Sequence, residues 1–253
     1  AVGAAKVLGL DRARVAETVS LSVIPNVSLD ATRYGNMSMW KGCAGGNGAR
    51  NGVFAALLAQ AGMTGPEKPF SGNHGLEALA GRFELQPFAE GKRAFRITET
   101  TLKCFASEGH SLSPITAALE LSRRIPADEI QSVTVYTYRF AWDVIGREPE
   151  KWRPTTRESA DHSMPYVVAA ALIDGSFGDE VFSPERLKDA RIRNLMDKIA
   201  VKEDPELTRR FPDCLPCRIE IISASGERIS ATTDYPRGHY KNPMSDGEIE
   251  NKF

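Results

Sequence analysis

Lys41 stands in a run of very small residues, where little would shield its charge. The run is Gly35-Asn-Met-Ser-Met-Trp-Lys-Gly-Cys-Ala-Gly-Gly-Asn-Gly-Ala-Arg-Asn-Gly. Each glycine costs a helix interior about 0.5–1 kcal/mol relative to alanine, so this many glycines indicate close approach of a backbone or a ligand. A phosphate loop is excluded, because its lysine follows the glycines and precedes a Ser or Thr. Two interpretations remain: a cation in an anion pocket, or a surface lysine whose stem covers apolar surface.

Glu108 and His110 come just before an apolar helical pattern, in Lys103-Cys-Phe-Ala-Ser-Glu-Gly-His-Ser. The start of a helix offers free backbone N–H groups and the positive end of the helix dipole, which suit anionic substrate groups. A carboxylate and an imidazole at this spacing can serve as base and acid. The alternative is that Ser111 or Ser113 only caps the helix and that His110 lies on the surface.

A third polar group, Asp161-His162-Ser163, also precedes an apolar helical pattern. Consecutive side chains diverge, so these three residues cannot form a catalytic triad. We expect Asp161 to cap the helix and His162 to point into a pocket. A cap beside a buried structural histidine is the alternative.

The segment Tyr235-Pro-Arg-Gly-His lies between the last predicted strand and the last predicted helix. We interpret it as a hinge, although Arg237 could still reach an anion from there.

Histidine and cysteine spacing gives no metal pattern. The four His form neither H-x-x-x-H nor H-E-x-x-H, so we predict no metal site. Cys214-Leu-Pro-Cys217 is a lone pair with no second pair beside it, and we expect the four Cys to be ordinary reduced thiols.

Periodicity and capping signals predict the elements that position these residues. The predicted helices cover residues 1–10, 12–24, 36–62, 75–81, 113–123, 163–172, 184–196 and 245–252. The predicted strands cover residues 130–138, 218–223 and 228–233, with a short extended segment at 102–105. Asp11 should cap the second helix, Ser225-Gly226 should join the last two strands as a hairpin, and Ser245 with Glu248 should form a capping box.

This order of elements predicts an α+β fold, in which a helical domain is interrupted by a smaller α+β domain. We place a partial helical domain at residues 1–98, the smaller α+β domain at 99–237 and a return to the helical domain at 238–253. The sequence starts at Ala1 without an initiator Met and stops at Phe253 without an ending signal. We therefore expect an internal fragment of a longer protein.

Composition narrows the function classes. The 253 residues are 42% hydrophobic, enough for one large or two modest domains. The net charge of −1 argues against binding to nucleic acid or to an anionic membrane surface. No apolar run approaches the roughly 20 residues that span a bilayer. We expect a cytoplasmic protein, or one of the mitochondrial matrix in a eukaryote.

Four stretches together resemble the MmgE/PrpD family, which includes 2-methylcitrate dehydratase and cis-aconitate decarboxylase. They are Met37-Ser-Met-Trp-Lys-Gly-Cys-Ala, Phe105-Ala-Ser-Glu-Gly-His-Ser, Lys151-Trp-Arg-Pro-Thr-Thr-Arg-Glu-Ser-Ala-Asp-His-Ser-Met-Pro-Tyr and Tyr235-Pro-Arg-Gly-His. The resemblance implies a cofactor-free lyase or isomerase that acts on small polycarboxylates as a homodimer. It also implies a helical domain with an α+β lid and an active site between them, in members roughly twice this length.

The resemblance also implies roles for single residues. Lys41 matches a pocket lysine of the family, which would bind a carboxylate and stabilise an enolate. Glu108 followed by His110 is the dehydratase pattern, because the itaconate-forming decarboxylases carry His at the first of these positions. Either Glu108 or His110 would be the base, and His162 the acid. The expected substrate-binding residues are Lys103, Arg157, Trp142 and Arg237.

On this pattern the expected reaction is dehydration of 2-methylcitrate to 2-methyl-cis-aconitate. The alternatives are cis-aconitate decarboxylation, epimerisation or isomerisation of a related dicarboxylate, and a non-catalytic member of the family.

Overall fold

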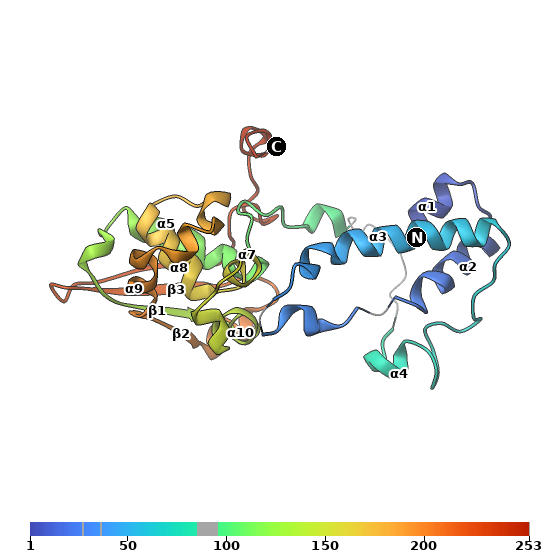
Figure 1. Cartoon of the computed structure of the whole chain (residues 1–253), viewed down its shortest axis with the longest axis horizontal. Helices are drawn as coiled ribbons and strands as arrows, with labels where there is room; N and C mark the ends of the chain where they lie inside the picture. Colours follow the sequence, from blue (N-terminus) through green and yellow to red (C-terminus); the bar gives the residue numbers. More distant parts are fainter. Residues whose placement is uncertain (27, 36, 85–95, 253) are drawn as a thin grey trace. The chain divides into compact units, whose positions relative to one another are not determined.

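The computed structural model describes residues 1–26, 28–35, 37–84 and 96–252. The chain divides into two compact units (Figure 1). The first comprises Ala1–Thr32 and Ser38–Arg93, and the second comprises Arg33–Met37 and Ala94–Phe253. The boundaries that we expected after residues 98 and 237 remain a prediction.

The first unit is helical. Its helices are α1 (Val2–Val7), α2 (Arg12–Val23), α3 (Trp40–Gln60) and α4 (Glu77–Ala80). A 3₁₀ turn, η1 (Asp30–Arg33), begins in this unit and ends at the first residue of the second unit. Helices α1 and α2 pack on each other and on α3. Asp11 caps α2 as predicted, since its carboxylate accepts a hydrogen bond of 2.8 Å from the Arg14 backbone N–H.

The glycines of α3 differ in whether close packing requires them. A Cβ atom on Gly52 would lie 2.5 Å from the backbone nitrogen of Ala1, so this position needs glycine for close packing. An added Cβ at the four glycines that follow Lys41 would meet no atom of the described residues within 4 Å; these are Gly42, Gly45, Gly46 and Gly48. Helix packing therefore explains Gly52 and not the glycines beside Lys41. The helix begins at Trp40, after non-helical residues 37–39, whereas the start expected at residue 36 lies outside the described residues.

The second unit is built on a four-stranded mixed sheet, which confirms the α+β fold class. The strand order is β2-β1-β3-β4, and the strands are β1 (Ile130–Thr137), β2 (Ile199–Glu203), β3 (Cys217–Ser223) and β4 (Arg228–Thr233). Strand β1 pairs with β2 in parallel and with β3 antiparallel. The predicted β3–β4 hairpin is confirmed, whereas β2 was not predicted.

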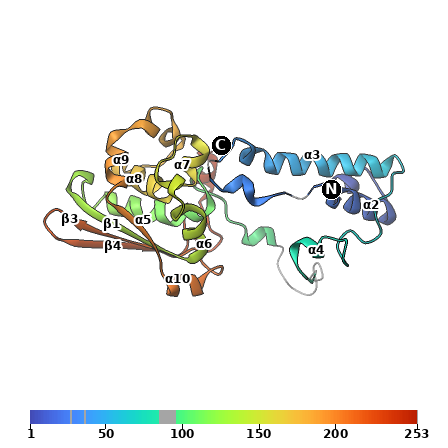
Figure 2. The same cartoon turned by 60° about the horizontal axis from the view of Figure 1, so that its bottom comes forward.

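Two helices cover one face of this sheet, α5 (Leu112–Ser122) and α8 (Met164–Asp174) (Figures 1 and 2). The shorter helices of the unit are α6 (Arg139–Ala141), α7 (Arg157–Asp161), α9 (Ala190–Met196), α10 (Pro205–Arg210) and α11 (Asp246–Glu250). A π-turn, η5, follows α6 at Trp142–Gly146. The 3₁₀ turns are η2 (Arg96–Glu99), η3 (Gly109–Ser111), η4 (Ala127–Glu129), η6 (Pro149–Trp152), η7 (Asp179–Phe182) and η8 (Arg186–Lys188).

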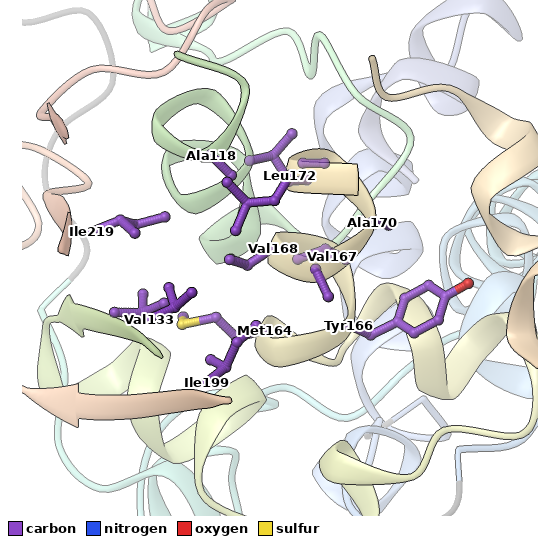
Figure 3. Close-up of a cluster of buried hydrophobic side chains, with 14 of the residues drawn as sticks. Ala118, Val133, Met164, Tyr166, Val167, Val168, Ala170, Leu172, Ile199 and Ile219 are labelled. Atoms are coloured by element: carbon purple, nitrogen blue, oxygen red, sulfur yellow. The ribbon is translucent and has the colours of Figure 1, made fainter. Parts of the chain in front are cut away.

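The core lies between α8 and the sheet. Figure 3 shows Met164 of α8 directed towards Val133 and Ile199, which are paired residues of β1 and β2. These three side chains are at most 7% exposed. Burying an aliphatic side chain of this size contributes about 1.5–3 kcal/mol. This layer therefore fixes the start of α8, and with it the residues just before the helix.

Two expectations about the second unit are corrected. The helix expected over residues 184–196 is interrupted, because Asp189 accepts a hydrogen bond of 2.8 Å from the Arg191 backbone N–H and starts α9 afresh. The extended segment expected at residues 102–105 becomes a bend at Cys104, and Leu102 donates one backbone hydrogen bond of 2.9 Å to Gly238. The capping box of Ser245 and Glu248 is confirmed at the start of α11. No helix among the described residues has both the length and the apolar character needed to cross a bilayer.

Candidate active site

The carboxylate of Glu108 is folded back against its own turn. Glu108 caps η3, and its Oε2 accepts a hydrogen bond of 2.6 Å from the backbone N–H of His110. Its other oxygen, Oε1, lies 3.8 Å from Nε2 of His110. The side chain of Glu108 is 14% exposed and that of His110 is 19% exposed. The two groups thus form one partly buried pair at the start of α5, and His110 does not lie on the surface.

The serines do not cap this helix. The Ser111 hydroxyl lies 2.6 Å from the Glu108 carbonyl and 2.7 Å from the Ser107 hydroxyl, and Ser113 donates to the Leu215 carbonyl at 2.5 Å. The Glu108 carboxylate caps the preceding turn η3, and no side-chain hydrogen bond from the described residues caps α5, so the alternative interpretation of this segment is wrong about the serines.

Backbone contacts join this turn to the end of α7. Glu108 donates its backbone N–H to the carbonyl of Asp161 at 3.3 Å, and the Ser107 hydroxyl donates to the same carbonyl at 3.2 Å. Two segments that the sequence analysis singled out separately therefore lie side by side in the second unit. Glu108 and His110 come from one segment and His162 from the other.

His162 is 2% exposed, and its Nδ1 is hydrogen-bonded to the carboxylate of Asp161. We expected Asp161 to cap α8, and this expectation is wrong. The cap is Ser163, whose hydroxyl accepts from the Tyr166 backbone N–H at 3.2 Å. Asp161 instead orients the imidazole, and such a partner decides which ring nitrogen carries the proton.

His110 lies among aromatic rings. Its Nδ1 is 2.5 Å from the phenolic oxygen of Tyr138, and its ring centroid is 5.0 Å from Phe140 and 6.1 Å from Phe211. Burial lowers the pKa of His110 below 6.5, Glu108 opposes this by raising it, and the charges of His162 and Lys103 lower it further. The imidazole is therefore neutral at pH 7.

The other candidate residues of this unit lie in different settings. Lys103 is exposed, and its ammonium donates to the Ser107 carbonyl at 2.8 Å, within the same loop as Glu108. Arg157 is half exposed and lies 3.4 Å from Asp179. Two guanidinium groups lie over the Trp142 ring, with Arg139 at 5.0 Å and Arg147 at 5.5 Å from its centroid.

Arg237 forms a two-pronged pair with Glu248. Its Nε donates to Oε1 at 2.9 Å, its Nη2 donates to Oε2, and its Nη1 donates to the Asn242 side chain at 3.1 Å. These contacts tie the segment after β4 to α11, and the hinge interpretation of this segment remains a prediction. A role for Arg237 in substrate binding remains a prediction.

Lys41 belongs to the first unit, in the first turn of α3, and its side chain is partly buried. Its expected convergence with Glu108, His110 and His162 remains a prediction.

The described residues contain no group of three or more His, Cys, Asp or Glu that could hold a metal ion. All four cysteines are free, and burial raises the pKa of Cys104, Cys214 and Cys217, which disfavours reactive thiolates at these positions.

Tyr138 was not predicted as a partner of His110. The two residues are 28 positions apart, and Tyr138 follows a strand whose alternation gives no hint of a polar contact.

Comparison with known sequences assigns the chain to a family. The profile of the MmgE/PrpD N-terminal domain matches residues 1–86, and that of the MmgE/PrpD C-terminal domain matches residues 105–253. The chain belongs to the MmgE/PrpD family.

Curated relatives share about a quarter of their residues with this chain. The 2-methylcitrate dehydratase of Salmonella typhimurium is 27% identical over 248 residues, which cover 93% of this chain and 51% of that protein. The cis-aconitate decarboxylase of Homo sapiens is 23% identical, covering 100% of this chain and 53% of that protein. The alkylcitrate dehydratase of Talaromyces stipitatus is 26% identical, covering 86% and 48%. The chain thus spans about half the length of the curated relatives that it matches.

Proposed function

We propose that this protein is a cofactor-independent lyase that removes water from a small polycarboxylate, and that its substrate is 2-methylcitrate. The observation that carries this proposal is the pairing of Glu108 with His110 beside the buried His162. A carboxylate and two imidazoles within one partly buried cluster are the groups that acid–base elimination needs. The names of the curated relatives support the reaction class, since two of the three described above are dehydratases.

The proposed elimination takes a proton from the carbon next to a carboxylate and expels a hydroxyl group from the neighbouring carbon. The C–H electron pair first becomes an enolate on that carboxylate, and then forms the new double bond as the C–O bond breaks. The departing hydroxide takes a proton and leaves as water. Glu108 or His110 is the base, and His162 gives the proton to the leaving group.

The enolate needs positive charge, because the starting proton is only weakly acidic. In this proposal Lys41 stabilises the enolate. Lys103, Arg157, Trp142 and Arg237 contribute to substrate binding. The position of Lys103 supports this role, because its ammonium binds the Ser107 carbonyl in the same loop as Glu108.

We further propose that the second unit acts as a lid on the helical part, that two copies form a homodimer, and that the protein works in the cytoplasm or the mitochondrial matrix. A lid would exclude water while the enolate exists.

The test is an absorbance assay on the full-length protein, which follows the new double bond in the ultraviolet. The substrates are 2-methylcitrate, citrate and cis-aconitate, each assayed before and after dialysis against EDTA. We expect turnover of 2-methylcitrate that survives dialysis. Release of CO₂ from cis-aconitate would instead identify a decarboxylase. Exchange of substrate hydrogen with solvent deuterium, without a double bond, would identify an epimerase or isomerase. A folded protein that does none of these would be a non-catalytic member of the family.

A further inference from the structure

Tyr138 is held rigidly beside His110. It directly follows β1, its side chain is 1% exposed, and its ring stacks on Phe211 with centroids 4.5 Å apart and an interplanar angle of 10°. Its hydroxyl oxygen lies 2.5 Å from Nδ1 of His110. Packing thus fixes the phenol, and the phenol in turn contacts one chosen nitrogen of the imidazole.

The direction of this hydrogen bond follows from burial. Burial raises the pKa of Tyr138 far above its ordinary value of 10.0, and the nearby Glu108 raises it further, so the phenol keeps its proton. A buried O–H donor without an acceptor costs about 1–3 kcal/mol. Among the described residues, Nδ1 of His110 is the hydrogen-bond partner of this hydroxyl. The lone pair of Nδ1 is therefore occupied, and a neutral imidazole must carry its single proton on Nε2.

The protonated Nε2 then faces Glu108. Oε2 of Glu108 is bound by a backbone N–H, whereas Oε1 lies 3.8 Å from Nε2. A protonated Nε2 can donate a hydrogen bond to a developing negative charge, but it cannot accept a proton. The carboxylate has no such restriction, because an ionised Glu is an acceptor only.

We propose that Tyr138 is a positioning residue that holds His110 as the Nε2–H tautomer, so that Glu108 acts as the base and His110 as a hydrogen-bond donor to the developing negative charge. The assignment of base and donor rests on the proposed function. The tautomer of His110 does not, and it can be measured without any substrate.

The tautomer is read by ¹⁵N NMR of the full-length protein labelled in histidine, with His110→Gln used to assign the resonances. At pH 8 we expect His110 to show an unprotonated Nδ1 that accepts a hydrogen bond and a proton on Nε2. In Tyr138→Phe, the Nδ1 resonance should move to the position of a nitrogen that accepts no hydrogen bond. In the same variant, kcat should fall about tenfold or more, while KM changes less than about twofold.

The matched control is Tyr166→Phe. Tyr166 is also buried, at 2% exposure, and its hydroxyl donates to the Val181 carbonyl at 2.5 Å. This variant loses a buried hydrogen bond of a phenol in the same unit, but it should leave the His110 resonances unchanged.

A wild-type spectrum with the proton on Nδ1 would overturn the proposal, whether or not Tyr138→Phe folds. The proposal would also be overturned if a folded Tyr138→Phe variant kept both the Nδ1 resonance of His110 and kcat unchanged. If the tautomer is found and no substrate is turned over, the proposed function fails and the role of Tyr138 stands.

Discussion

The carbonyl oxygen of Leu102 lies in the space that a Cβ atom on Gly238 would occupy. The same two residues share a backbone hydrogen bond of 2.9 Å, donated by Leu102 to the Gly238 carbonyl. Gly238 also has a φ of +91°, a conformation that L side chains rarely adopt. This contact anchors the segment that leads into the Glu108 loop to the segment that follows β4.

Gly238→Ala should lower the free energy of unfolding by more than about 2 kcal/mol, because backbone strain and a backbone clash act together. Urea unfolding followed by circular dichroism measures this. Gly226→Ala is the matched control, since Gly226 has a φ of +84° but nothing within 4 Å of an added Cβ among the described residues. Its loss should be about 1 kcal/mol. Equal losses in the two variants would contradict the role assigned to the Leu102 contact.

Glu248 should make stability depend on acid pH. The hydrogen bonds from Arg237, and then those from Ser245, lower the pKa of Glu248 from 4.5 to about 2. A lowered carboxylate pKa stabilises the fold above pH 4.5, and this contribution disappears as the pH falls from 4.5 towards 2. Glu248→Gln should therefore lose less stability than the wild type between pH 5 and pH 3 in urea titrations. Glu250→Gln, on the same helix and exposed, should behave like the wild type.

His110 should make stability depend on pH in a higher range than Glu248 does. Its pKa lies below the 6.5 of an unfolded histidine, with burial as the main cause and with Glu108, His162, Lys103 and Tyr138 around it. The unfolded chain therefore binds a proton first as the pH falls, and stability is lost below about pH 6.5, by at most about 1.4 kcal/mol per pH unit. His110→Gln should reduce this slope between pH 7 and pH 5. The exposed His74→Gln should not, and an equal slope in both variants would speak against a buried neutral His110.

Glu108→Gln should lower kcat by a factor of about 10² to 10⁴, because an amide cannot take the substrate proton. The amide oxygen can still accept from the His110 backbone N–H, so the fold should be kept. The dehydratase assay measures the change, and Glu120→Gln, exposed on α5, is the control. Retention of kcat would remove Glu108 from the role of base.

Lys41→Ala should reduce activity by about 10² or more if this ammonium stabilises the enolate. The side chain is only partly buried, so circular dichroism should show an unchanged fold. Lys6→Ala, at an exposed position of α1, should keep full activity. Full activity in Lys41→Ala would return Lys41 to the surface interpretation.

Local signals in the sequence predicted the local features well. The Asp11 cap and the Ser245–Glu248 box depend on residues three positions apart, so both could be read directly. Strand β2 could not, because a short run after a helix becomes a strand only through parallel pairing with β1, far away in the sequence. The Asp161 cap was wrong for a related reason. A carboxylate one residue from a histidine can bind the imidazole, and Ser163 was equally well placed to cap α8.

The residues of the candidate site also divide into those that a local motif predicts and those that only a long-range contact brings in. Glu108 and His110 were found because they lie two residues apart in one motif. Tyr138 was not, because its contact with His110 exists only once the end of β1 lies against η3. Hydrophobic alternation fixes which face of a strand is buried, but it does not specify the partner of a hydroxyl group just beyond the strand.

The position of β4 at the end of the sheet order has a consequence for the behaviour of the chain in concentrated solution. An outer strand offers unpaired backbone groups on which a foreign strand can add, and such addition starts aggregation. Arg124 donates to the backbone carbonyl of Ser230 at 2.9 Å and so occupies one acceptor on this strand. The exposed Arg228 adds charge where the strand begins. These two arginines therefore protect the sheet from adding a strand of another molecule along β4.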